Sequence, residues 1–218
     1  MKAQLLIPAA GMGQRLGPQG PKALVDLCGE PMLVRSLRAF SAVGLLAGAV
    51  ITVPASYIDT FREVLAGAFP AVAFSLVDGG AERQDSVDNG LKALDADTDL
   101  VVIHDAARPF VSPKSVQASI EAAESCGAAT VAIPCSDTIL EAQEDDFLRD
   151  TPDRARLWAC QTPQTFRVAV IRAAHAEARR SGFAATDDAT LVRRLGSTVK
   201  LVRGTPLNFK VTTPEDLA

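Results

Sequence analysis

The chain has 218 residues, of which 48% are hydrophobic and 22% are charged, so it has enough apolar material for a folded core and too much for a disordered chain. Its net charge of −4 lacks the basic excess that is typical of proteins that bind nucleic acids. The four cysteines form no CxxC pair and only two histidines are present, which disfavours a zinc site and predicts buried, reduced thiols.

No apolar run is long enough to cross a membrane, and the stretch Ala42–Val53 is short and contains two glycines. The first strand is predicted to begin by about residue 4, so we expect no signal or transit segment and a cytoplasmic location. The length, with no dividing linker, predicts one domain over residues 1–218.

Apolar runs alternate with helical patterns along the first two thirds of the chain. The predicted strands are Gln4–Pro8, Ala49–Val53, Val72–Val77, Leu100–His104 and Thr130–Pro134. The predicted helices lie near Pro31–Val43, Tyr57–Phe69, Ser86–Leu94 and Ser112–Cys126, the last with Ser112 as N-cap and Pro113 at the first helical position. Because these strands are apolar without alternation, we expect an α/β fold with a mostly parallel, twisted sheet between helices.

The alternation breaks after Pro134, where residues 135–165 are polar and include an acidic cluster. We predict two extended segments, Thr138–Glu141 and Leu157–Gln161, joined by an exposed loop. A long excursion of this kind suggests a protruding arm at about residues 135–157 that packs on a second subunit. The elements predicted after it are helices Arg167–Arg180 and Asp188–Leu195, strand Val199–Val202 and a last helix that starts at Thr213.

The first strand ends in a glycine-rich turn, residues 8–17 (PAAGMGQRLG). Such turns at the carboxyl end of a parallel strand bind phosphates, although a plain tight turn is the alternative. The GxGxxG fingerprint of nicotinamide-dependent oxidoreductases fails because Leu16 stands at its third glycine, and the P-loop pattern fails at Lys22.

Two cations, Arg15 and Lys22, follow the first strand and can reach a triphosphate bound there. Nucleotidyl transfer builds negative charge on the α-phosphate and on the departing pyrophosphate, and fixed cations stabilise that charge. The alternative is a pair of solvated surface cations.

A second glycine turn, residues 77–86 (VDGGAERQDS), also lies between a strand and a helix. Gly80 can pass close to a flat base, while Arg83 and Ser86 supply polar contacts. Alternatively, Asp85 is only a helix N-cap and the glycines only form a turn.

A third motif follows the strand that ends at His104. Asp105 stands at the carboxyl edge of the sheet, where it can hold Mg²⁺ or accept hydrogen bonds from a polyol. Alternatively, Arg108 pairs with Asp105 as a structural bridge, and His104 is interpreted as a hydrogen-bonded core histidine. Arg154 and Lys210 are isolated in the sequence, and they could converge on a second anion.

These motifs occur in an order that resembles the 2-C-methyl-D-erythritol 4-phosphate cytidylyltransferase family over nearly the whole chain. The matching segments are Ala9–Arg15, Pro21–Lys22, Asp78–Val87, His104–Pro109, Asp137–Thr138, Trp158, Thr162–Gln164, Thr186–Asp187 and Lys210–Leu217. The sequence departs from some members at Ala81 and Gln14.

The resemblance implies a Rossmann-like nucleotidyltransferase fold, a homodimer and defined residue roles. Arg15 and Lys22 match the transition-state stabilisers. Arg154 and Lys210 match residues that position the substrate phosphate, and Asp105 and Thr138 match polyol contacts, with Thr138 donated across the dimer. The residues that match the CTP pocket are Ala9, Ala10, Gly11, Gly13, Gly80 and Ser86, and the secondary candidates are Arg83, Arg108 and Thr162.

The expected reaction joins CTP to 2-C-methyl-D-erythritol 4-phosphate in the non-mevalonate pathway of isoprenoid precursor synthesis. Mg²⁺ is the expected cofactor, held mainly by CTP phosphates with Asp105 as the candidate protein ligand, and neither a nucleic acid nor a membrane is an expected partner. Two alternatives stay open, a ribitol 5-phosphate cytidylyltransferase and a non-catalytic nucleotide-binding regulator.

Overall fold

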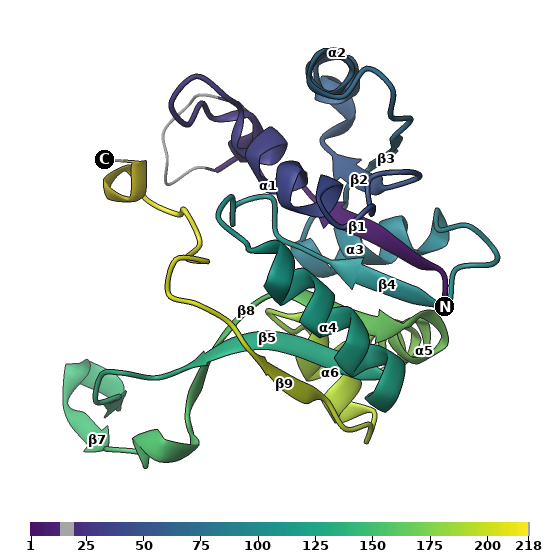
Figure 1. Ribbon diagram of the computed structural model, residues 1–218. Coiled ribbons are helices and arrows are strands. Elements are labelled where there is room, and N and C mark those ends of the chain that lie inside the picture. Colours follow the sequence, from purple (N-terminus) through teal and green to yellow (C-terminus); the bar gives the residue numbers. More distant parts are fainter. Residues whose placement is uncertain (14–19, 218) are drawn as a thin grey trace.

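The computed structural model describes residues 1–13 and 20–217, which build a seven-stranded sheet in the order β3-β2-β1-β4-β8-β5-β9 (Figure 1). Neighbouring strands pair in parallel, except that β8 runs antiparallel between β4 and β5. The predicted mostly parallel sheet is therefore confirmed. The strands are β1 Ala3–Pro8, β2 Val50–Val53, β3 Ser75–Asp78, β4 Leu100–Ile103, β5 Ala128–Pro134, β8 Trp158–Arg167 and β9 Lys200–Arg203.

Helices cover both faces of the sheet, because successive strand residues point to opposite sides. In β1, Leu5 and Ile7 enter one core with α1, α2 and α4, whereas Leu6 enters another with α3, α5 and α6. No helix of the described residues is long and apolar enough to span a membrane. The helices are α1 Met32–Ser41, α2 Ile58–Ala68, α3 Arg83–Lys92, α4 Pro113–Cys126, α5 Val168–Ser181 and α6 Asp188–Arg194.

Helix α3 begins earlier than predicted, at Arg83 rather than near Ser86. Glu82 is its N-cap, and the side chains of Glu82 and Asp85 form a reciprocal capping box. The alternative of Asp85 as the N-cap is therefore wrong. In α4 the predicted start is confirmed, since the Ser112 side chain accepts a hydrogen bond from the Ser115 N–H.

Two other predicted boundaries change. The edge strand β3 starts at Ser75 instead of Val72, because the chain still turns before it, with the Val72 N–H donating to the Phe69 carbonyl. The predicted last helix is only a 3₁₀ turn, Pro214–Leu217.

The segment between β5 and β8 leaves the central sheet (Figure 1). It carries β6 (Glu141–Ala142) and β7 (Leu148–Asp150), which pair with each other in a separate two-stranded sheet. The predicted extended segment Thr138–Glu141 has no regular strand before Glu141, where β6 begins. The predicted segment Leu157–Gln161 belongs mostly to β8, which continues into the middle of the sheet. Contact with a second subunit stays a prediction.

The cysteines are all free thiols, as predicted, but they are not buried. Cys28, Cys126 and Cys160 are exposed and Cys135 is half-buried. Cys28 lies in a turn with a left-handed backbone and Cys126 ends α4, so neither faces the core.

Candidate active site

Three predicted motifs meet at one edge of the sheet. Strands β1, β3 and β4 belong to one parallel set, so the chain leaves all of them at their carboxyl edge. This edge carries Ala9–Gly13 after β1, Gly79–Gly80 after β3 and Asp105 after β4. Ligands of open α/β sheets bind at such an edge.

The two glycine turns pack directly on each other. A Cβ atom on Gly79 would lie 2.2 Å from the Cβ of Ala10, so only glycine permits this approach. The Gly80 N–H donates to the Ser86 hydroxyl at 3.0 Å, and that hydroxyl donates to the Glu82 carbonyl at 3.1 Å. The two turns that carry the predicted nucleotide residues are thus in direct contact.

A backbone hydrogen bond joins Lys22 to the glycine turn that follows β1. Its N–H donates to the Gly11 carbonyl at 3.0 Å, and a 3₁₀ turn, Lys22–Leu24, begins with it. Gly13 has a φ of +65°, and a Cβ there would lie 2.7 Å from the Cβ of Lys22. Arg15, the other predicted stabilising cation, lies outside the described residues.

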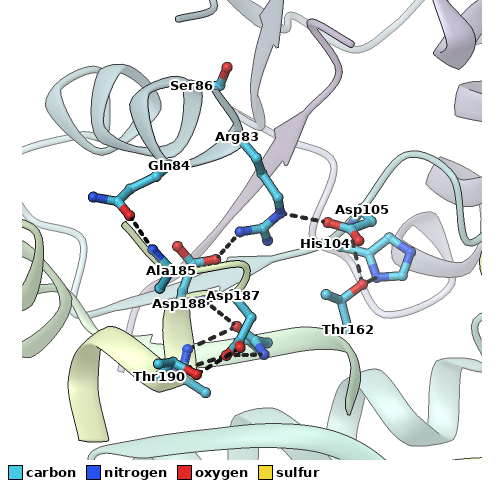
Figure 2. A network of polar contacts seen from close by, with 12 residues as sticks. Arg83, Gln84, Ser86, His104, Asp105, Thr162, Ala185, Asp187, Asp188 and Thr190 are labelled. Carbon is cyan, nitrogen blue, oxygen red and sulfur yellow. Dashed lines mark hydrogen bonds and ion pairs between the residues drawn. The ribbon is translucent and has the colours of Figure 1, made fainter. Parts of the chain in front are cut away.

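Asp105 lies between two cations. Its Oδ1 accepts a hydrogen bond from Arg83 Nε at 3.0 Å, and its Oδ2 accepts one from Lys210 Nζ at 2.8 Å (Figure 2 shows the Arg83 contact). Burial alone would raise the pKa of Asp105, but the charges of Arg83 and Lys210 outweigh it and hold that pKa well below its ordinary value. Asp105 and Lys210, two predicted substrate-positioning residues, are therefore brought together.

Arg108 does not pair with Asp105, so that alternative is wrong. Its guanidinium instead donates to the carbonyls of Asn208, at 2.7 Å, and Cys160, at 3.2 Å. Burial lowers the pKa of Arg108. Arg108 thus joins the segment after β4 to β8 and to the chain that carries Lys210.

His104 is a core histidine, as predicted. It is fully buried, with Nδ1 3.0 Å from the Thr162 hydroxyl and Nε2 3.1 Å from the Arg108 carbonyl (Figure 2 shows the Thr162 contact). Burial lowers its pKa to about 4. The Thr162 hydroxyl also accepts from the Asp105 N–H at 3.0 Å, which places this secondary candidate directly behind Asp105.

Asp188 is a site residue that the sequence analysis missed. It is 1% exposed and accepts from Arg83 Nη1 at 2.8 Å. In the sequence, Thr186-Asp187-Asp188 is recognisable only as part of a family motif and the start of a helix. The only hint of a role for Asp188 in the sequence is that a second carboxylate directly follows Asp187. Its position next to Arg83 becomes visible only in the folded chain.

Arg154 and Thr138 lie together in a different place. They line a surface hollow of about 550 Å³ with the neighbouring Pro134, Cys135 and residues 151–155. Arg154 donates to the Ser136 carbonyl at 2.7 Å. No hydrogen bond or ion pair of the described residues joins either side chain to Asp105 or Lys210.

The described residues contain no group of three His, Cys, Asp or Glu side chains that could hold a metal ion. Both oxygens of Asp105 accept from cations, whose positive charges would repel a divalent ion placed there, so Asp105 does not fit the role of a direct magnesium ligand. Mg²⁺ fits this edge only if nucleotide phosphates supply most of its ligands.

The chain is similar in sequence and fold to known proteins over most of their length. The family model for 2-C-methyl-D-erythritol 4-phosphate cytidylyltransferase matches residues 3–218. Proteins of that name from Pelotomaculum thermopropionicum and Geobacter metallireducens are 44% and 45% identical, covering 99% and 97% of this chain and 91% and 93% of theirs.

A crystal structure of the Thermus thermophilus protein of that name superposes with a TM-score of 0.81 at 38% identity, covering 100% of this chain and 96% of its own. The 4-diphosphocytidyl-2C-methyl-D-erythritol synthase of Anaerococcus prevotii superposes with a TM-score of 0.87 at 29% identity, covering 99% and 94%. The chain belongs to the 2-C-methyl-D-erythritol 4-phosphate cytidylyltransferase family.

Proposed function

We propose that this chain transfers the cytidylyl group of CTP to 2-C-methyl-D-erythritol 4-phosphate. The products are 4-diphosphocytidyl-2-C-methyl-D-erythritol and pyrophosphate, in the non-mevalonate route to isoprenoid precursors. The observation that carries this proposal is the meeting, at one sheet edge, of two packed glycine turns with Lys22 and of the Asp105–Lys210 pair with Arg83.

The reaction is an in-line displacement. An oxygen of the acceptor phosphate forms a bond to the α-phosphorus of CTP while the bond from that phosphorus to the bridging oxygen breaks and pyrophosphate leaves with the electron pair. The attacking phosphate is already anionic near neutral pH, so no strong base is required. This suits a site whose nearby His104 is buried and has both ring nitrogens engaged.

Catalysis then depends on position and charge. We propose that the glycine turns and Ser86 bind the nucleotide, with Lys22 and Arg15 stabilising the charge that develops on its phosphates. Asp105 would accept hydrogen bonds from the polyol hydroxyls while Lys210 attracts the acceptor phosphate. Mg²⁺, carried mainly by the nucleotide, would supply further neutralisation of phosphate charge.

We further propose a homodimer in which Arg154 and Thr138 of one subunit complete the site of the other. Two observations support this arrangement. Both residues lie in the segment that leaves the central sheet, and neither contacts the described Asp105–Lys210 pair of its own chain. That segment also exposes large apolar side chains, Phe147 and Leu148 among them, which a subunit interface would bury. The charged substrates support a cytoplasmic location.

The test is pyrophosphate release with CTP, UTP and ATP, each offered with 2-C-methyl-D-erythritol 4-phosphate and with ribitol 5-phosphate, in Mg²⁺ and in EDTA. We expect turnover with CTP and the methylerythritol acceptor, and its loss in EDTA. Preference for ribitol 5-phosphate would overturn the proposed acceptor. CTP binding without turnover on either acceptor would instead indicate a regulator.

A further inference from the structure

Asp188 carries a buried carboxylate that the proposed chemistry does not use. It is the first residue of α6 and is 1% exposed. Oδ2 accepts from Arg83 Nη1 at 2.8 Å, Oδ1 lies 3.2 Å from His175 Nε2, and the Asp188 N–H donates to Gln164 Oε1 at 3.0 Å. Burying a carboxylate costs free energy unless the carboxylate is paired, and here both oxygens of Asp188 have a partner.

Arg83 is held from two sides. Its Nη1 donates to Asp188 and its Nε donates to Asp105, so the planar guanidinium is a bridge between two carboxylates (Figure 2). Burial alone would lower the pKa of Arg83, but the Asp188 and Asp105 charges raise it. Two anchored nitrogens fix both the place and the plane of a guanidinium.

The Asp105 end of this bridge lies in the proposed acceptor site. Because Arg83 occupies Oδ1 of Asp105, Oδ2 is left to Lys210, and the carboxylate is oriented between the two cations. Moving Arg83 would allow Asp105 to rotate and Lys210 to follow it. The position of Lys210 therefore depends on Arg83, although no hydrogen bond of the described residues joins these two side chains directly.

We propose that Asp188 is a positioning residue for the acceptor: by anchoring Arg83 on the side away from the site, it orients Asp105 and Lys210 for the polyol phosphate. This inference rests on the proposed function. Asp188 acts through Arg83 and touches no substrate itself.

The nucleotide side of the site has additional contacts that do not involve Asp188. The start of α3 is held by the Glu82–Asp85 capping box, and the Gly80 turn is held by the Ser86 hydroxyl. Loss of the Asp188 charge should therefore weaken acceptor binding more than CTP binding, whereas general damage to the fold would affect both.

The test is the Asp188→Asn variant, which keeps the shape of the side chain and removes its charge. We expect the KM for the polyol phosphate to rise about tenfold and the KM for CTP to change less than about threefold, since the variant removes the charge that strengthens the hydrogen bond from Arg83, and Arg83 contacts Asp105 on the acceptor side. Unchanged KM values for both substrates would show that Asp188 only fills space, and would overturn the proposal.

The matched control is Asp88→Asn. Asp88 likewise forms an ion pair between α3 and a neighbouring helix, in this case with Arg179 of α5, and it also pairs with Lys92. It should leave both KM values close to those of the wild type. A rise in the acceptor KM as large as that of Asp188→Asn would mean that any lost α3 ion pair has this effect, against the proposal.

A double-mutant cycle with Arg83→Gln tests the route of the effect. If Asp188 acts through Arg83, adding Asp188→Asn to Arg83→Gln should raise the acceptor KM little further, whereas two full, multiplying effects would overturn the proposal.

Should Asp188→Asn fail to fold, Asp188→Glu retains the charge, and an acceptor KM near the wild type supports the proposal while a tenfold rise contradicts it. A wild-type enzyme without turnover would instead contradict the proposed function.

Discussion

The Asp105 carboxylate stays ionised although it is buried, because two cations lie within hydrogen-bonding distance of it. Its pKa in the folded chain is below the ordinary value of 3.8, so its contribution to stability is present above that pH and is lost as the pH falls through the lower, folded value. The Arg83–Asp105–Lys210 arrangement is therefore complete at neutral pH, where the reaction is expected to run.

Lys22 is the cation whose replacement should affect turnover most directly. We expect Lys22→Ala to lower kcat by roughly 10²–10³, as for the loss of one preorganised donor to developing charge. Steady-state assays with both substrates saturating measure this effect. If the variant kept the wild-type kcat, Lys22 would have no role in catalysis.

His104 should make folding stability depend on pH. Its pKa falls from 6.5 to about 4 on burial, so the unfolded chain binds more protons between those values. The contribution is complete above pH 6.5 and is lost as the pH falls toward 4, which lowers the free energy of unfolding by about 3 kcal/mol.

Urea unfolding at several pH values, compared between the wild type and His104→Gln, measures the contribution of His104 to the free energy of unfolding. Carboxylates contribute to both curves, so the difference between them isolates the histidine. The variant should lose less stability than the wild type between pH 6.5 and pH 4. Parallel curves would contradict the interpretation of His104 as a neutral core histidine.

At the scale of elements, the turns that follow β1 and β3 pack against each other. Gly79→Ala would drive a Cβ to 2.2 Å from that of Ala10 and separate the turns. Because such overpacking costs about 1–3 kcal/mol, we expect the KM for CTP to rise by roughly 5- to 150-fold.

Gly67→Ala is a suitable control for this change, since Gly67 lies in α2 with no atom within 4 Å of the added methyl group. Its KM for CTP should match that of the wild type. If Gly79→Ala also bound CTP normally, the packed turns would not be the nucleotide site.

At the scale of the whole molecule, the proposed dimer predicts complementation between inactive subunits. Lys22→Ala and Arg154→Ala chains, unfolded and refolded together, should form mixed dimers in which one site has both native residues. About a quarter of all sites would then be active in a random mixture.

The control is each variant refolded alone, which should stay at its own low activity. Sedimentation of the wild type checks that the dimer exists. If the mixture shows only the average of the two variants, Arg154 acts within its own subunit and the crossing segment is not part of the partner's site.

The alternation of apolar runs with helical patterns was sufficient to predict a mostly parallel α/β sheet, because burial on both faces gives the central strands β1, β2 and β4 continuous apolar runs. The polar residues after β1, β3 and β4 were predictable for a related reason: parallel strands bring the residues at their carboxyl ends to one edge of the sheet. Boundaries were less accurate, as at α3, which begins at Arg83 rather than near Ser86 and is capped reciprocally by Glu82 and Asp85.

The sequence by itself determined the fold class, the family and most of the candidate side chains, since these depend on local pattern and on motif order. Only the tertiary structure decided which side chains and strands of this chain pair with one another. It paired Asp105 with Arg83 and Lys210 rather than with Arg108, inserted β8 antiparallel into the sheet, and placed Asp188 behind Arg83. Such pairings join residues that are far apart in the chain, and no local pattern encodes which of several buried charges will meet.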